Sequence, residues 1–67
     1  MTRFKAIFVH AEGLEERDIG SSYGLSADSL DAAEQEALAL PAPDGANFVK
    51  LLDEGWVVKT VGLPVDA

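Results

Sequence analysis

The stretch ANFVKLLDEGWVVKTV (Ala46–Val61) contains two runs of apolar and β-branched residues on either side of Asp53-Glu54-Gly55. Side chains of this kind are typical of β-strands. Gly55 can adopt the left-handed conformation that a three-residue hairpin loop with a bulge requires. The stretch therefore predicts an antiparallel hairpin formed by residues 46–52 and 56–61.

Upstream of this hairpin, the spacing of the apolar residues changes to that of a helix, which predicts a helix over residues 28–40, DSLDAAEQEALAL. Asp28 or Ser29 is in position for the N-cap, and two prolines end the helix at Pro41 and Pro43. One face carries an apolar stripe that we expect to pack on the sheet, formed by Leu30, Ala33, Ala37 and Leu40.

Two further strands are predicted before the helix. Residues 3–9 are rich in aromatic and β-branched side chains, and in residues 19–27 mostly apolar residues alternate with Gly and Ser. We interpret the acidic stretch between them, HAEGLEERD (His10–Asp18), as a turn. The order ββαββ predicts an α+β fold, an antiparallel sheet of about four strands with one helix packed on one face. We expect a single domain over residues 1–67, with residues 64–67 frayed.

The charges along the strands predict which face of the sheet a single helix leaves open. We expect the helix to cover a face formed by Phe4, Ala6, Phe8, Val49, Leu51, Trp56 and Val58. The other face mixes lysines with apolar residues: Lys5, Ile7, Val9, Phe48, Lys50, Leu52, Val57, Lys59 and Val61. Because exposed apolar patches are often interfaces, the candidates for self-association are Ile7, Phe48, Lys50, Val57 and Lys59. The alternative is that loops cover part of this face, or that the last strand has the opposite parity.

The composition argues against several classes of function. With no Cys and one His, the 67-residue chain has no disulfide and is poorly suited to a structural zinc site, and we expect no metal and no cofactor. Its 12 Asp and Glu against 5 Lys and Arg give a formal net charge of -7, which disfavours direct contact with nucleic acid or an anionic membrane and favours basic partners. We see no secretory signal and no stretch of about 20 apolar residues, so we expect a cytoplasmic protein.

The stretch HAEGLEERD also raises the question of catalysis or cation binding. A hydrolase would need His10 as the base for Ser21 or Ser22, with Glu12 to orient it, and no oxyanion-hole turn is evident. Carboxylates suit calcium or magnesium, but this run lacks the ligand alternation of an EF-hand loop. We therefore predict that the protein is not an enzyme and has no dedicated metal site.

The acidic residues themselves are the remaining candidate for function. Arg17 is the one Arg or Lys within residues 10–49, so the negative charge of the first turn and the helix is not balanced locally. We infer that these carboxylates contact a basic nucleic-acid-binding protein and compete with its nucleic acid. The predicted contacts are Glu12, Glu15, Glu16, Asp18, Asp31, Glu34 and Glu36. The alternative is that they only keep a small protein soluble.

In size, charge and strand-helix order, the whole chain resembles the small acidic anti-CRISPR proteins of phages and mobile elements. Some of those proteins are α+β domains that block the DNA-recognition groove of a Cascade-type complex. The class has no common sequence motif, so the resemblance transfers no residue role. It implies a non-catalytic inhibitor whose partner is a Cas effector subunit. The alternative is a structural or phage assembly module that pairs with itself through the open sheet face or an edge strand. We expect a monomer or a homodimer.

Overall fold

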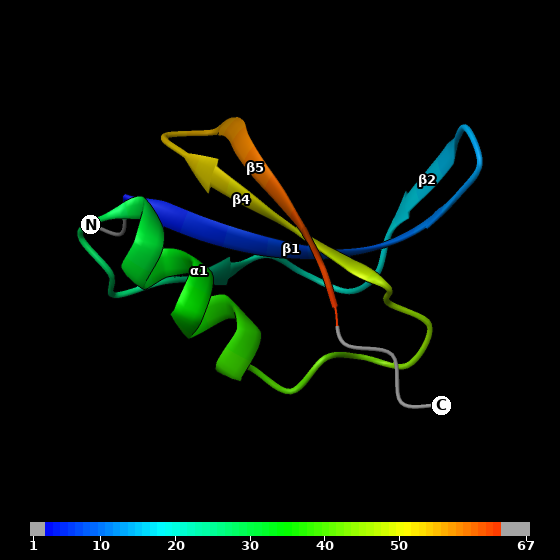
Figure 1. Ribbon diagram of the computed structural model, residues 1–67, viewed down its shortest axis with the longest axis horizontal. Coiled ribbons are helices and arrows are strands. Elements are labelled where there is room, and N and C mark those ends of the chain that lie inside the picture. The colour runs from blue at the N-terminus through cyan, green and yellow to red at the C-terminus, as the bar shows by residue number, and fades with distance from the viewer. Residues whose placement is uncertain (1–2, 64–67) are drawn as a thin grey trace.

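An antiparallel sheet and one helix form the fold of the computed structural model, which describes residues 3–63 (Figure 1). The elements are β1 (Phe4–Glu12), β2 (Glu15–Asp18), β3 (Tyr23–Gly24), α1 (Leu30–Ala39), β4 (Phe48–Asp53) and β5 (Trp56–Gly62). The strand order is β2-β1-β4-β5, with β3 also paired to β1. The predicted α+β class, with a helix against an antiparallel sheet, is confirmed. The fraying expected for residues 64–67 lies outside the described residues.

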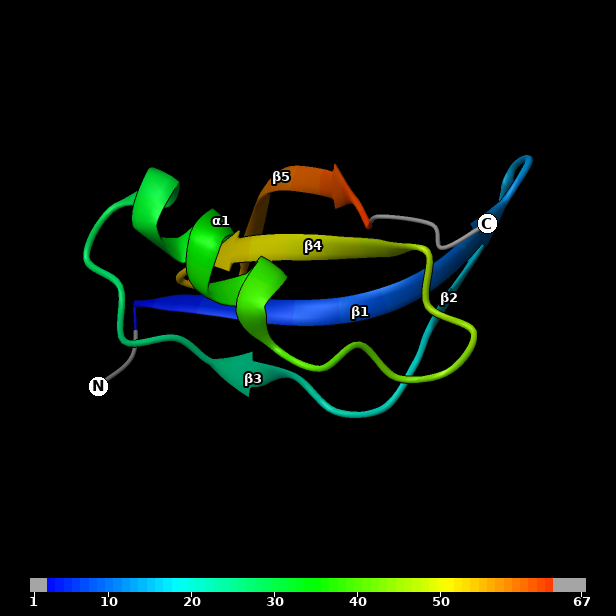
Figure 2. The same ribbon diagram turned by 60° about the horizontal axis from the view of Figure 1, so that its bottom comes forward.

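α1 begins and packs as its sequence predicts. The Ser29 hydroxyl accepts a hydrogen bond from the backbone N–H of Ala32 at 3.3 Å, which makes Ser29 the N-cap. Ala33 and Ala37 are fully buried against the sheet, because their small side chains allow the helix to approach it closely (Figure 2). The core that they complete contains Phe4, Ala6, Phe8, Leu25, Val49 and Leu51. Within residues 3–63, no helix has the length and apolar character needed to cross a membrane.

The second strand predicted from the sequence, residues 19–27, is wrong. The chain follows the edge of β1 but pairs with it in two short pieces, β2 and β3. Between Asp18 and Tyr23 it contains two more residues than the facing stretch of β1, so the ladder is interrupted. Gly20 lies at this break with a φ of 76°, a left-handed conformation that a regular strand does not contain.

The hairpin of β4 and β5 is confirmed, with a shorter loop and a displaced bulge. Glu54 and Gly55 form a two-residue turn, and their positive φ angles of 52° and 91° are typical of a type I′ turn. The bulge is not at this glycine. It lies at Val58, where the pairing register shifts between Leu51 and Leu52 of β4.

This bulge corrects the faces that we predicted for β5. Lys59 and Val61 pair with buried residues of β4, so they lie on the helix side and not on the open face. Trp56 precedes the bulge and pairs with Asp53, so it lies on the helix side as expected, but it is 78% exposed and not covered. Val58, in the bulge, was also expected to be covered and is 45% exposed. An extra residue in one strand moves the side chains that follow it to the opposite face, and the sequence pattern alone does not locate it.

The open face is narrower than predicted because the sheet curls. β1 continues past β4 and curves into the hairpin that it forms with β2 (Figure 2). Lys50 of β4 contacts Glu16 of β2 on this side of the sheet. Val9, which we expected to be open, is fully buried there, whereas Val57 at the far edge is 52% exposed. Part of this face is therefore buried, and the segment seen to reach over it is the strand β2 and not the loops that we expected.

Candidate functional site

The stretch HAEGLEERD is part of a β-hairpin and not the turn that we predicted. Its two halves belong to β1 and β2, and Gly13 and Leu14 alone form the connection. Gly13 has a φ of 61° and Leu14 does not share this positive φ, the combination of a type II′ turn, which needs Gly in its first position. We call residues 10–18 the acidic hairpin. It projects at one end of the molecule (Figure 1). The side chain of Leu14, in its turn, is fully exposed.

The register divides the side chains of the acidic hairpin between two faces. Residues paired across two strands project to the same side. The side that continues the helix-covered face carries the cross-strand pairs Glu12–Glu15 and His10–Arg17. Glu16 and Asp18 pair with Ala11 and Val9, so they project on the other side. The hairpin therefore presents carboxylates from both of its faces.

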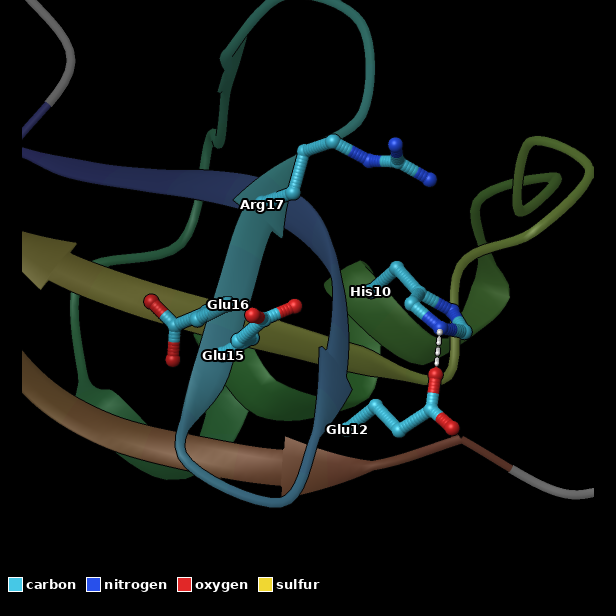
Figure 3. A pocket seen from close by; sticks show the side chains of 5 residues that line it. All are labelled: His10, Glu12, Glu15, Glu16 and Arg17. Atoms are coloured by element: carbon cyan, nitrogen blue, oxygen red, sulfur yellow. Dashed lines mark ion pairs between the residues drawn. The ribbon is translucent and has the colours of Figure 1, made fainter.

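Glu12 and Glu15 face each other directly across the two strands. Like charges in this position destabilise a sheet, because their Cβ atoms are only about 5 Å apart. Among residues 3–63, the ion-pair partner found for either carboxylate is His10, whose Nε2 lies 3.7 Å from Glu12 Oε2 (Figure 3). The repulsion between Glu12 and Glu15 is thus left largely uncompensated within this part of the chain.

Hydrogen bonds from the loop before β4 hold the base of the acidic hairpin. The Asn47 side chain accepts from the backbone N–H of Ala11 and donates to its carbonyl, each at 2.8 Å. His10 Nδ1 lies 2.7 Å from the carbonyl oxygen of Gly45, and because a carbonyl only accepts, Nδ1 is the protonated donor. Sequence reasoning gave Asn47 no role. The available signal was a polar residue directly before an apolar strand.

Glu16 is partly engaged within the protein itself. Its carboxylate binds Lys50 Nζ of β4. This hydrogen bond raises the pKa of Lys50, and the charges of Glu16 and Asp18 add to the rise. Of the contacts predicted in this stretch, Glu12, Glu15 and Asp18 are therefore more available to a partner than Glu16.

The contacts predicted on α1 do not join the acidic hairpin. α1 and the hairpin tip lie toward opposite ends of the molecule in both views (Figures 1 and 2). Glu34 contacts Lys59 of β5, and this contact raises the pKa of Lys59. Glu36 accepts hydrogen bonds from the backbone N–H and the hydroxyl of Ser26, at 3.0 and 2.9 Å. Asp31 is exposed on α1. Helix and hairpin thus carry two separate groups of carboxylates.

The residues predicted for self-association are also divided between two sides. Ile7, Phe48 and Lys50 are half-buried on the open face, and Val57, which pairs with Leu52, is exposed on the same face. Lys59 lies on the helix side. The apolar part of the open face is therefore smaller than the sequence suggested.

A hollow of about 410 Å³ adjoins the acidic hairpin and is lined by His10, Glu12, Glu15, Glu16 and Arg17 (Figure 3). All five side chains are charged or titratable, whereas pockets for small-molecule substrates are mostly apolar. Among residues 3–63, the ring of His10 contacts Gly45 and Glu12, not the serines at positions 21 and 22. The hollow is thus a charged depression of the surface and not an apolar pocket.

The carboxylates of the acidic hairpin do not converge on one point. Successive residues of a strand project to opposite faces, so Glu15 and Glu16 point apart. In the part of the chain that the structure describes, no group of three or more His, Cys, Asp or Glu is arranged to hold a metal ion. No known protein family, curated protein or solved structure matches the chain.

Proposed function

We propose that this is a non-catalytic binding protein whose acidic hairpin occupies a basic, nucleic-acid-binding surface of a partner protein and competes there with nucleic acid. The observation that carries the proposal is the direct pairing of Glu12 with Glu15. Their repulsion opposes folding, and a Lys or Arg side chain of the partner would relieve it. Folding alone favours a pair of opposite charges at these positions.

The shape of the acidic hairpin supports entry into a groove. Two strands about 5 Å apart make a thin ribbon, and side chains two residues apart on one strand project about 7 Å apart on the same face. Glu12 and Glu15 project from one face of this ribbon, so both carboxylates can reach the same wall of such a groove. Lysines and arginines that neutralise phosphates are the groups that this ribbon attracts.

A Cas effector subunit is the partner class that we propose. The support is the resemblance of the chain to small acidic anti-CRISPR proteins in size, charge and α+β architecture. Inhibition of this kind needs no catalysis, because occupying the DNA groove is sufficient. The net charge of -7 opposes direct contact with DNA, so the inhibitor would act on the protein. We propose a cytoplasmic location, where an effector meets its target DNA.

A competition experiment tests the proposal. An effector complex holding labelled DNA is titrated with the protein at low and at high salt, and the released DNA is measured. We expect release at low salt that weakens steeply as salt increases. The double variant Glu12→Gln/Glu15→Gln should compete about tenfold less well, a difference of ~1.4 kcal/mol.

The matched control is Asp31→Asn/Glu54→Gln, which removes the same charge outside the acidic hairpin. It should compete like the unmodified protein. Equal losses in the two double variants would mean that net charge alone acts, and the proposed role of the hairpin would be wrong.

A self-associating structural module, such as a phage assembly component, is the second candidate. The observation that favours it is Val57, which is 52% exposed and pairs with the half-buried Leu52 on the open face. On this proposal Val57→Lys converts a concentration-dependent dimer into a monomer in sedimentation experiments. An unmodified protein that stays monomeric at high concentration removes the candidate.

A further inference from the structure

The outer edge of β5 is an apolar feature that the proposed function does not use. Trp56, Val57 and Val58 are consecutive and are 78%, 52% and 45% exposed. β5 pairs with β4 on one side, and among residues 3–63 no strand pairs with its other side (Figure 1). Backbone N–H and C=O groups therefore remain open along an edge strand of seven residues.

This edge has few of the features that normally prevent an edge strand from pairing with another chain. Proteins block such edges with lysines, prolines or bulges, and runs of three exposed apolar residues are avoided unless they have a use. β5 has a bulge at Val58 but no proline, and its one lysine, Lys59, is drawn to Glu34. Tryptophan is also among the residues that contribute most to protein interfaces, which makes Trp56 a suitable anchor.

The charges beside the middle of β5 are unbalanced toward the negative. Lys59 contacts Glu34, and Asp31 lies close enough to contribute to the raised pKa of Lys59. Two carboxylates thus share one ammonium group next to the edge. This leaves a net negative charge on the helix side of β5.

The turn at the start of β5 has the same imbalance. Arg3 donates two hydrogen bonds of 3.0 Å to the carboxylate of Asp53, the residue that pairs with Trp56. The charge of Glu54 also acts on Arg3 and helps to raise its pKa. Here again two carboxylates accompany one cation.

We propose that the outer edge of β5 binds an extended segment of a partner in which basic and apolar residues alternate, added to the sheet as a further strand. Backbone hydrogen bonds to β5 would hold the segment, as in other cases of β-strand addition. Its cations would face the two negative clusters on one side, and its apolar side chains would lie beside Val57 on the other. This inference goes beyond the proposed function and concerns a different surface from the acidic hairpin.

The charges beside β5 favour a basic segment over a second copy of the chain. Antiparallel pairing of two β5 strands about a two-fold axis would bring the cluster of Asp31, Glu34 and Lys59 close to its own copy. Each cluster is net negative and each chain carries a formal charge of -7, so the two copies repel. A basic strand meets the same edge with attraction.

The test uses Trp56, the sole tryptophan of the chain, as its reporter. The full-length protein is titrated with a synthetic peptide of alternating Lys and Val, and Trp56 emission and its quenching by acrylamide are followed. We expect a blue shift and a severalfold decrease in quenching. A Glu/Val peptide of equal length, and a Lys/Val peptide with Pro at its centre to block strand pairing, should have no effect.

Two variants connect the binding to the edge. Val57→Lys should abolish the response while circular dichroism shows an intact fold, and Glu34→Gln should weaken it severalfold. Glu12→Gln/Glu15→Gln should leave it unchanged, which separates this inference from the role of the acidic hairpin. An equal response to the Pro-containing peptide, no response to any peptide, or a Trp56 emission that depends on protein concentration alone would overturn the inference.

Discussion

Asn47 and Ala11, 36 residues apart in the chain, are joined by two hydrogen bonds of 2.8 Å between the Asn47 side chain and the Ala11 backbone. The backbone pairing of β4 with β1 ends at Phe48 and Val9. Beyond this pair, the Asn47 side chain makes hydrogen bonds to β1 that the backbone of a longer β4 would otherwise make. It thus ties β1 to the loop before β4 at the point where β1 enters the acidic hairpin. This amide and the contact of His10 with Gly45 therefore help to position the candidate site.

Replacing this amide should loosen the base of the acidic hairpin. Asn47→Ala leaves the part-buried N–H and C=O of Ala11 without partners, which we expect to destabilise the fold by about 1–3 kcal/mol. Asn47→Asp keeps the acceptor for the N–H and should lose less. Urea unfolding measures the loss, and faster amide exchange at Ala11 locates it. Unchanged exchange in Asn47→Ala would contradict this role.

The Glu12–Glu15 pair predicts opposite effects on stability and on binding. Glu15→Lys replaces a repulsive cross-strand pair with an attractive one, so we expect it to stabilise the protein by about 0.5 kcal/mol. The same change should abolish competition with DNA for the basic partner. Thermal unfolding and the competition assay measure the two effects. A less stable Glu15→Lys variant would show that the two carboxylates do not repel each other as inferred.

Val9 and Val57 should respond differently to truncation, although the sequence places both on the open face. Val9 is fully buried, so Val9→Ala should cost about 1–3 kcal/mol. Val57 is 52% exposed, and Val57→Ala should change stability by less than about 0.5 kcal/mol. Urea unfolding measures the loss of stability in both variants and so tests whether the sheet curls at Val9. Equal losses would mean that the open face is flat.

Glu36 should act on stability and not on partner binding. Its carboxylate accepts hydrogen bonds from the N–H and hydroxyl of Ser26, which fix the segment that leads into α1. Glu36→Gln should destabilise the fold by about 1 kcal/mol, because bonds to a charged acceptor are the stronger ones. The control, Asp28→Asn, removes the same charge nearby. If binding of a basic partner weakens with Glu36→Gln and not with Asp28→Asn, Glu36 is a contact residue and this prediction is wrong.

The contact between Lys50 and Glu16 predicts a loss of stability at high pH. The hydrogen bond to Glu16 raises the pKa of Lys50 above its ordinary value of 10.5. A lysine whose pKa is raised by folding stabilises the fold below the unfolded pKa, and this contribution disappears as pH increases through the folded pKa. We expect the urea midpoint to decrease above about pH 10.5 by less in Lys50→Met than in the unmodified protein. The two proteins should differ in this loss of unfolding free energy by less than about 1 kcal/mol, because solvent screens the contact between Lys50 and Glu16.

The elements with strong local patterns could be predicted from the sequence. The Ser29 cap, the stripe around Ala33 and Ala37 and the apolar alternation of β1 and β4 each depend on residues that are close in the chain. Period and capping are local properties. They were sufficient for the α+β class, for the helix and for the buried face of the two central strands.

The candidate site could be predicted only in its residues and not in its shape. Glu15 and Arg17 have side chains that are common in turns and helices, and they form a strand because β1 offers them an edge to pair with. β-propensity is weak compared with such pairing. The acidic stretch was therefore identified as charged, while its form as a projecting hairpin came from the tertiary structure.

The sequence by itself determined the helix, the central strands and the imbalance of charge, since each follows from residue type and local spacing. The tertiary structure alone decided the bulge at Val58, the burial of Val9 and the separation of Glu12 and Glu15 from the helix carboxylates. The physical reason is that register and curl arise from contacts between strands distant in sequence. A shift of one residue in such a contact reverses the faces of a strand without changing its pattern.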